Sequence, residues 1–212
     1  MGFSIPTDNS LVGPFTPMRF EATVEECIVS QGEIPPELSG GFYRTGPTWK
    51  RPTKQGTNPI LSMDGMVQGL VLDNGRADFR NRWIRTPKYL LEEKHGRGLF
   101  EWTDGGFGDW RDFAYGDVQR DKYTQGVPQG RNNINIFPFA GELVASSEHG
   151  APPIAIDPIT LATRGIVNWS SRLSPGVHEP AAYGDATFSG HPKWDHETGD
   201  LYGGAIGTQR PT

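Results

Sequence analysis

A tight-turn tripeptide between two strand-like runs is the feature that most constrains the fold of this chain. Residues 66–72 are mainly apolar, and Asp73-Asn74-Gly75 follows them. Residues 77–85 then alternate between two types of side chain, as the two faces of a strand do. Asn-Gly suits the left-handed backbone of a two-residue hairpin turn, and a period of two is typical of a strand. The pattern therefore predicts a β-hairpin. On its second strand Phe79, Asn81 and Trp83 share one face, and Arg80, Arg82 and Ile84 share the other.

Related turn signals recur at residues 157–160 and 195–199, each between two strand-like runs. The chain also holds 28 Gly and 18 Pro, which long helices tolerate poorly. Repeated antiparallel units of this kind are typical of a β-propeller, whose blades take about 40 to 50 residues each. A chain of 212 residues then holds roughly three to four blades. We expect an all-β chain that is a truncated part of a larger propeller.

The remaining elements follow from the same reading. Residues 88–96 form the single predicted helix, and residues 103–130 a long irregular loop. Three prolines near the start predict an irregular arm over residues 1–20, ahead of one truncated propeller domain over residues 21–212. The predicted strands are residues 26–29, 41–44 (ended by Gly46-Pro47), 133–139, 141–146, 153–156, 161–167, 188–193 and 201–206.

Charge and cysteine content limit the partners and the compartment. The net charge of −5 argues against a nucleic-acid partner, because phosphate binding needs a clustered positive surface. The Arg80, Arg82 and Arg85 cluster is predicted to be surface or hairpin charge. Cys27 is the only cysteine; we expect a small core residue in a reducing, cytoplasmic compartment. No apolar run approaches the roughly 18 residues that span a bilayer.

Two short segments carry residues suited to metal chemistry. His191 lies in the turn-rich stretch 188–195, and Glu148 lies in the Ser-Glu-His-Gly stretch 147–150. A neutral imidazole binds a first-row metal through one ring nitrogen, and a carboxylate is the usual partner of its other N–H. The sequence contains no His-x-x-x-His pair and no facial triad. The remaining histidines are predicted to be surface or turn residues: His95, His149, His178 and His196.

Several segments together resemble a known family. Residues 40–47 (Gly-Gly-Phe-Tyr-Arg-Thr-Gly-Pro), 63–67 (Met-Asp-Gly-Met-Val), 75–86 (a strand ending Arg-Asn-Arg-Trp-Ile-Arg-Thr) and 190–193 (Gly-His-Pro-Lys) match its motifs in order. The family is the carotenoid cleavage oxygenases, which include the lignostilbene dioxygenases. The resemblance runs from about residue 20 to residue 206. Any one of these motifs alone would be weak, whereas the ordered run is specific.

The resemblance implies a seven-bladed β-propeller with a non-haem ferrous ion, Fe(2+), on its axis. In the family four His bind the iron and three Glu orient some of those His. His191 matches the first iron ligand, and Glu148 matches the first orienting Glu; the others belong to regions beyond residue 212. The implied reaction is cleavage of a conjugated C=C bond by O2. The implied substrate is an apolar carotenoid, apocarotenoid or stilbene, and the resemblance leaves peripheral membrane contact and the oligomeric state open.

The chain departs from the family pattern at three points. Met63 replaces a Gly, Gln68 replaces a His that is not an iron ligand, and the spacing between Glu148 and His191 is long. Asp64 is expected to stabilise a turn, and Tyr43 and Trp83 are expected to be core aromatics. Two alternatives stay open: a non-catalytic fragment that cannot hold iron by itself, and an unrelated propeller that binds small molecules or glycans.

Overall fold

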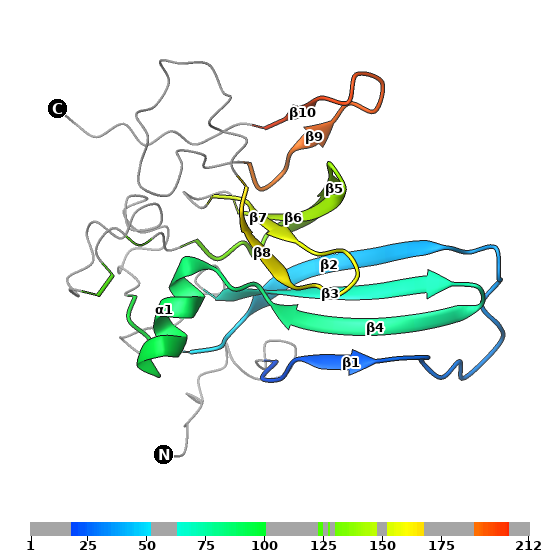
Figure 1. Cartoon of the computed structure of the whole chain (residues 1–212), viewed down its shortest axis with the longest axis horizontal. Helices are drawn as coiled ribbons and strands as arrows, with labels where there is room; N and C mark the ends of the chain where they lie inside the picture. Colours follow the sequence, from blue (N-terminus) through cyan, green and yellow to red (C-terminus); the bar gives the residue numbers. More distant parts are fainter. Residues whose placement is uncertain are drawn as a thin grey trace, which may run out of the picture.

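The computed structural model describes residues 18–51, 63–100, 123–124, 127, 130–147, 152–167 and 189–203. Its strands form two four-stranded antiparallel sheets and one two-stranded hairpin (Figure 1). Within these residues α1 is the single helix, so the all-β prediction is confirmed, and no helix there is long and apolar enough to cross a membrane. The elements are β1 (Ala22–Val24), β2 (Gly40–Thr48), β3 (Asp64–Asp73), β4 (Arg76–Trp83), α1 (Pro87–His95), β5 (Asn135–Phe139), β6 (Glu142–Ser146), β7 (Ile154–Ile156), β8 (Thr163–Ile166), β9 (Lys193–Trp194) and β10 (Leu201–Tyr202).

The predicted hairpin is the centre of the first sheet, whose strand order is β1-β4-β3-β2. β3 and β4 pair from Met66↔Trp83 to Asp73↔Arg76 around Asn74 (φ 46°) and Gly75 (φ 77°), which confirms the hairpin. The prediction that Gly46-Pro47 ends the preceding strand is wrong, because β2 continues to Thr48. β2 is an edge strand, and an edge position tolerates Pro because the missing N–H would not face a neighbouring strand.

The first strand lies earlier in the chain than predicted. Residues 26–29 are not a strand, and β1 instead pairs Ala22–Val24 with β4. Glu26 takes a left-handed backbone (φ 53°), which breaks the strand, and its N–H binds the Asp78 carboxylate at 2.9 Å. Cys27 is therefore a half-buried residue that follows a bend, and not a core strand residue.

The second sheet is a simple meander, in the order β5-β6-β7-β8. The strands predicted at residues 133–139, 141–146, 153–156 and 161–167 are all present, each somewhat shorter. Asp157 and Asp195 close related turns, because each carboxylate accepts the N–H groups two and three residues later. These backbone hydrogen bonds lower the pKa of both carboxyl groups.

The helix α1 confirms the prediction for residues 88–96. Thr86 caps its start, accepting the Tyr89 N–H at 3.1 Å, and Pro87 occupies the first helical position. Gly96 ends it in a left-handed conformation (φ 70°). In Figure 1, α1 lies at the end of the first sheet where β4 finishes.

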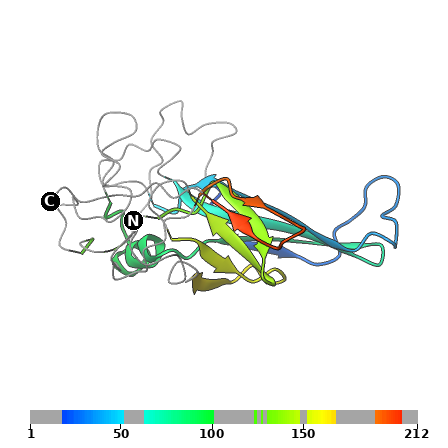
Figure 2. The same ribbon diagram turned by 90° about the horizontal axis from the view of Figure 1, so that it is seen from above.

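The two sheets pack face to face around one apolar cluster. On the side of the first sheet the cluster contains Val67 of β3 and Ile84, which follows β4. On the side of the second sheet it contains residues of β6, of β7 and of the β7–β8 connection: Leu143, Ala145, Ile154, Ile156 and Leu161. Tyr43 packs against it as predicted, and its hydroxyl donates to the Pro158 carbonyl at 2.8 Å. Trp83 faces the other side of the first sheet, buried with Met66 and Tyr89. Figure 2 shows the far ends of β2, β3 and β4 projecting beyond the second sheet.

A third layer begins on the outer face of the second sheet. Val144 clusters there with Phe137 and Phe139, on the face opposite the shared core. Trp194 of β9 meets Phe139 edge-on, with ring centroids 6.1 Å apart. The hairpin β9–β10 thus stacks on the second sheet as the second sheet stacks on the first, which is the arrangement of successive propeller blades.

Candidate functional site

Buried polar side chains gather where β2 and β6 end and β3 begins. We call this set the polar end: Thr48, Asp64, Lys88, Glu92, Arg131, Asn132, Asn133, Ser146 and Ser147, all of them buried. Buried polar groups are costly unless they are paired. The pairings of these residues therefore show what the polar end holds in place.

A buried ion-pair triad joins α1 to the start of β3. The Lys88 ammonium lies 2.7 Å from Asp64 Oδ1 and 2.8 Å from Glu92 Oε2, and each of these side chains is 5% exposed or less. The second oxygen of each carboxylate is also bound: Asp64 accepts the Lys50 N–H, and Glu92 accepts the Leu99 N–H at 2.9 Å. Asp64 is therefore an ion-pair partner rather than the turn stabiliser that we expected.

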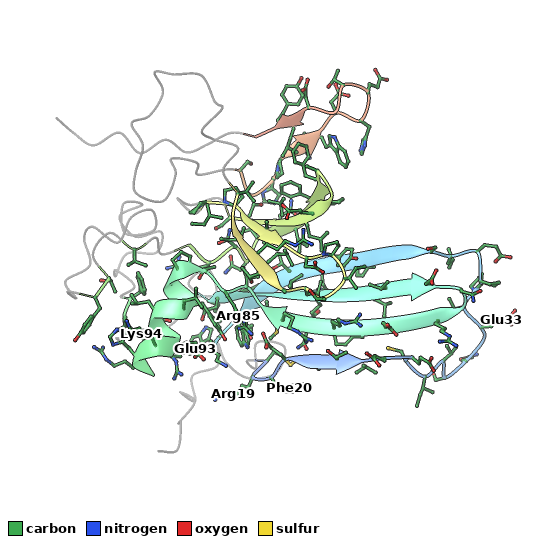
Figure 3. All side chains as sticks on the ribbon, in the orientation of Figure 1. Arg19, Phe20, Glu33, Arg85, Glu93 and Lys94 are labelled. Carbon is green, nitrogen blue, oxygen red and sulfur yellow. The ribbon has the colours of Figure 1, made fainter. Side chains whose placement is uncertain are left out.

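Burial and charge act against each other in the triad. Burial alone would lower the pKa of Lys88, but the Asp64 and Glu92 carboxylates outweigh it and raise the pKa. For Glu92 burial prevails over the pull of Lys88, so its pKa is raised. Burial lowers the pKa of Arg131 to about 10. Figure 3 labels Glu93 and Lys94, two other residues of the same helix, of which Lys94 is exposed.

The segment 131–133 ties the two sheets together at the polar end. The Asn132 side-chain amide donates to the Ala145 carbonyl at 3.0 Å and to the Pro152 carbonyl at 2.9 Å. The Asn133 amide donates to the Met63 carbonyl at 2.7 Å. A Cβ on Gly65 would lie 2.5 Å from the Arg131 carbonyl oxygen, so only glycine allows β3 to approach this closely.

The predicted metal ligand, His191, is exposed just before β9. Its backbone N–H is bound by Ser189 Oγ at 3.0 Å. The Asp195–Asp200 turn closes the far end of the hairpin, so His191 lies at the open end. His196 is exposed and stacks on Trp194 with ring centroids 4.5 Å apart, in agreement with its prediction as a turn residue.

Glu148 lies outside the described residues, as do His149 and His178. The described residues on either side are the buried Ser147, which follows β6, and Pro152, which precedes β7. Among the described residues no three His, Cys, Asp or Glu side chains converge as a metal site would require. In the part of the chain that the structure describes, His191 therefore belongs to no group of three such side chains.

Sequence reasoning missed Lys88, Glu92, Asn132 and Asn133. Lys88 and Glu92 stand four residues apart within the predicted helix, a spacing that favours an ion pair but does not reveal burial. Asn132 takes a left-handed backbone (φ 48°), a conformation that Asn tolerates better than most residues. Its two carbonyl partners are Ala145 on β6 and Pro152 just before β7; both strands were predicted, but their position relative to Asn132 was not.

Comparison with known proteins gives concordant matches. The family model described as retinal pigment epithelial membrane protein matches residues 15–212. The lignostilbene-α,β-dioxygenase isozyme III of Sphingomonas paucimobilis is 32% identical over 92% of this chain and 35% of its own length. The resveratrol cleavage oxygenase 1 of Aspergillus fumigatus is 34% identical over 89% of this chain and 33% of its own length.

A solved structure agrees with the fold. The crystal structure of Pseudomonas brassicacearum lignostilbene dioxygenase superposes with a TM-score of 0.75 at 28% identity, covering 95% of this chain and 37% of that one. The β-propeller prediction is thereby confirmed for this part of the molecule. The chain spans about a third of the length of the relatives it matches.

Proposed function

The chain belongs to the retinal pigment epithelial membrane protein family, that of the carotenoid and stilbene cleavage oxygenases, and we propose that the full-length protein cleaves a conjugated C=C bond with O2. The observation that carries the proposal is the match to named cleavage oxygenases along about nine-tenths of this chain. In the balanced reaction R–CH=CH–R′ and O2 give R–CHO and R′–CHO, with one oxygen atom in each aldehyde.

A stilbene is the substrate class that we favour over a carotenoid. The two relatives at 32% and 34% identity are named for lignostilbene and resveratrol, both of which are phenolic stilbenes. The superposed crystal structure is also a lignostilbene dioxygenase. A phenolic stilbene is apolar along its double bond, so the site needs a dry channel with a polar contact at its end.

We assign His191 as one iron ligand and Glu148 as the carboxylate that accepts its other ring N–H, which would fix the tautomer. The outer face of the second sheet supports this pairing. Val144 and Ser146 of β6 lie on that face, where the β9–β10 hairpin also packs. Because residues two apart on a strand share a face, Ser146 lies on the same face as Val144 at the end of β6, two positions before Glu148 in the sequence.

The strand directions support the same pairing. Trp194 lies beside Phe139, which is at the turn joining β5 to β6. Both His191 and Ser147 lie away from that turn, at the open ends of their hairpins.

A ferrous ion held by imidazoles supplies binding and activation of O2 next to the double bond. The described residues contribute the ligand itself and a rigid pair of sheets that holds it.

We further propose that residues 21–212 belong to one propeller domain behind an arm at residues 1–20. The shared core between the two sheets and the stacked third layer support one domain. Membrane contact and a cytoplasmic location stay predictions.

The test uses full-length protein loaded with ferrous iron and given either a 4-hydroxystilbene or an apocarotenal. We expect two aldehydes from the stilbene, each carrying one ¹⁸O atom from ¹⁸O2. His191→Ala should lose iron and product together, whereas His196→Ala, a turn histidine on the same hairpin, should keep both. Stoichiometric iron in the His191→Ala variant would refute the ligand assignment.

The alternative, a non-catalytic fragment, concerns the 212 residues alone. The observation behind it is that three converging metal-binding side chains are lacking among the described residues. We expect purified 212-residue protein to retain much less than one iron per chain. Tight one-to-one iron in that protein would remove the alternative.

A further inference from the structure

The backbone of His191 is restrained from both sides by its neighbours in the sequence. On one side, Ser189 Oγ accepts the His191 N–H at 3.0 Å. On the other side, Pro192 follows directly, and its ring disfavours the helical conformation for the residue before it. Two restraints of different origin, a hydrogen bond and a steric clash, therefore act on the conformation of this one residue.

The same type of hydrogen bond occurs at the other end of the β9–β10 hairpin, in a different setting. There Thr198 Oγ1 accepts the Asp200 N–H at 3.2 Å, within the turn that joins the two strands. Ser189 lies at the open end of the hairpin, ahead of β9, where its hydrogen bond closes no hairpin in the described part of the chain. The Ser189 hydroxyl thus acts on the backbone of His191, and not on a chain reversal.

A metal ligand binds best when its direction is fixed before the metal arrives. His191 is exposed, so packing holds its side chain less firmly than it holds a buried one. The backbone conformation then matters more, because it sets the Cα–Cβ direction and decides which rotamers the imidazole can adopt. We infer that Ser189 is a positioning residue for His191, an inference that rests on the proposed role of His191 as an iron ligand.

Three variants separate the Ser189 hydroxyl from the rest of the hairpin. Ser189→Ala removes the acceptor of the His191 N–H and changes little else. Ser189→Thr keeps a hydroxyl that can accept the same N–H. The matched control is Thr198→Ala, which removes the equivalent hydrogen bond to Asp200 in the closed turn of the same hairpin.

The experiment uses full-length protein and measures Fe(II) affinity, the visible spectrum of bound Co(II), and millisecond amide hydrogen exchange without metal. We expect Ser189→Ala to weaken Fe(II) binding by about 2- to 10-fold, the effect of losing one hydrogen bond that fixes the ligand. The Co(II) bands should shift because they report the arrangement of the ligands, and the peptide with His191 should exchange faster. Ser189→Thr should restore all three measurements. Thr198→Ala should speed exchange in its own turn alone and leave metal binding unchanged.

The outcomes separate this inference from the proposed function. Faster exchange in Ser189→Ala with unchanged Fe(II) affinity and an unchanged Co(II) spectrum would show a local turn only and overturn the positioning role. An equal loss of affinity in Thr198→Ala would show a general effect of hairpin order and overturn it as well. Wild-type protein that binds no iron, or a His191→Ala variant with wild-type affinity, would overturn the ligand assignment in the proposed function, and the inference with it.

Discussion

Replacing Lys88 by Met is the sharpest test of the energetics at the polar end. Met has a similar length and keeps the apolar stem, but it removes the ammonium that lies 2.7 Å from Asp64 and 2.8 Å from Glu92. Two buried carboxylates then lose the cation that donates a hydrogen bond to each of them. Breaking a buried pair by deleting one partner typically costs about 3–5 kcal/mol.

The matched control is an exposed network with the same chemistry. Arg164 pairs with Glu142 at 2.9 Å and also with Asp157, and its side chain is 45% exposed. Arg164→Met should cost far less than Lys88→Met, because solvent screens exposed pairs. For a domain of about 200 residues, the cost of Lys88→Met corresponds to a fall in Tm of roughly 6–20 °C.

Urea unfolding followed by circular dichroism, with Tm measured alongside, gives both values. Adding Glu92→Gln alone to Lys88→Met should recover part of the loss, because Asp64 then stays as one buried carboxylate near the buried Arg131 guanidinium. A cost below about 1 kcal/mol for Lys88→Met alone, or no recovery in the double variant, would refute a buried ionised triad.

The pH dependence has a defined sign. Since its partners raise the pKa of Lys88 in the folded state, its stabilisation is complete below the ordinary lysine pKa of about 10.4 and is lost as pH rises through the folded value. In Lys88→Met the ammonium that lowers the pKa of Glu92 is gone, so burial raises that pKa further. A carboxyl whose folded pKa is raised stabilises the protein as pH falls through that pKa, so the variant should gain more stability toward the carboxyl range than the wild type, in which the same pKa is raised less.

Two further predictions follow from the same region. Gly65→Ala should lower the free energy of unfolding, measured in urea, by at least about 1–3 kcal/mol, because the new Cβ would lie 2.5 Å from the Arg131 carbonyl oxygen. The control is Gly46→Ala, whose new Cβ would have no atom within 4 Å and which should destabilise the protein far less. Equal destabilisation by the two variants would contradict the close approach at Gly65. Burial, followed by the nearby Glu93 carboxylate, raises the pKa of Tyr89 to about 12. Ultraviolet titration of the wild type against Tyr89→Phe should show one phenol that ionises near pH 12. The stability that the neutral phenol contributes is complete below about pH 10 and should be lost as pH rises through the folded pKa. Ionisation of this phenol near pH 10 would count against its burial.

Local signals in the sequence predicted most of the elements. Asn74-Gly75 predicted its hairpin, and the helix predicted over residues 88–96 ends at Gly96 as expected. The Thr86-Pro87 start was a further local signal that the prediction did not use. Each of these signals acts within a few residues, through a left-handed backbone or an N–H that needs an acceptor. The prediction failed at residues 26–29 and at Gly46-Pro47, where pairing in the sheet overrode local preference.

The alternating strands, the turns, the helix and, through an ordered run of motifs, the family could all be predicted from the sequence. The tertiary structure was needed to show that Asp64 meets Lys88, that Asn133 reaches Met63 across 70 positions, and that Asn132 donates to the carbonyls of both Ala145 and Pro152. Such pairs depend on the register of two sheets and on how they stack. No local propensity encodes that geometry, because it arises from burying one apolar core between the sheets.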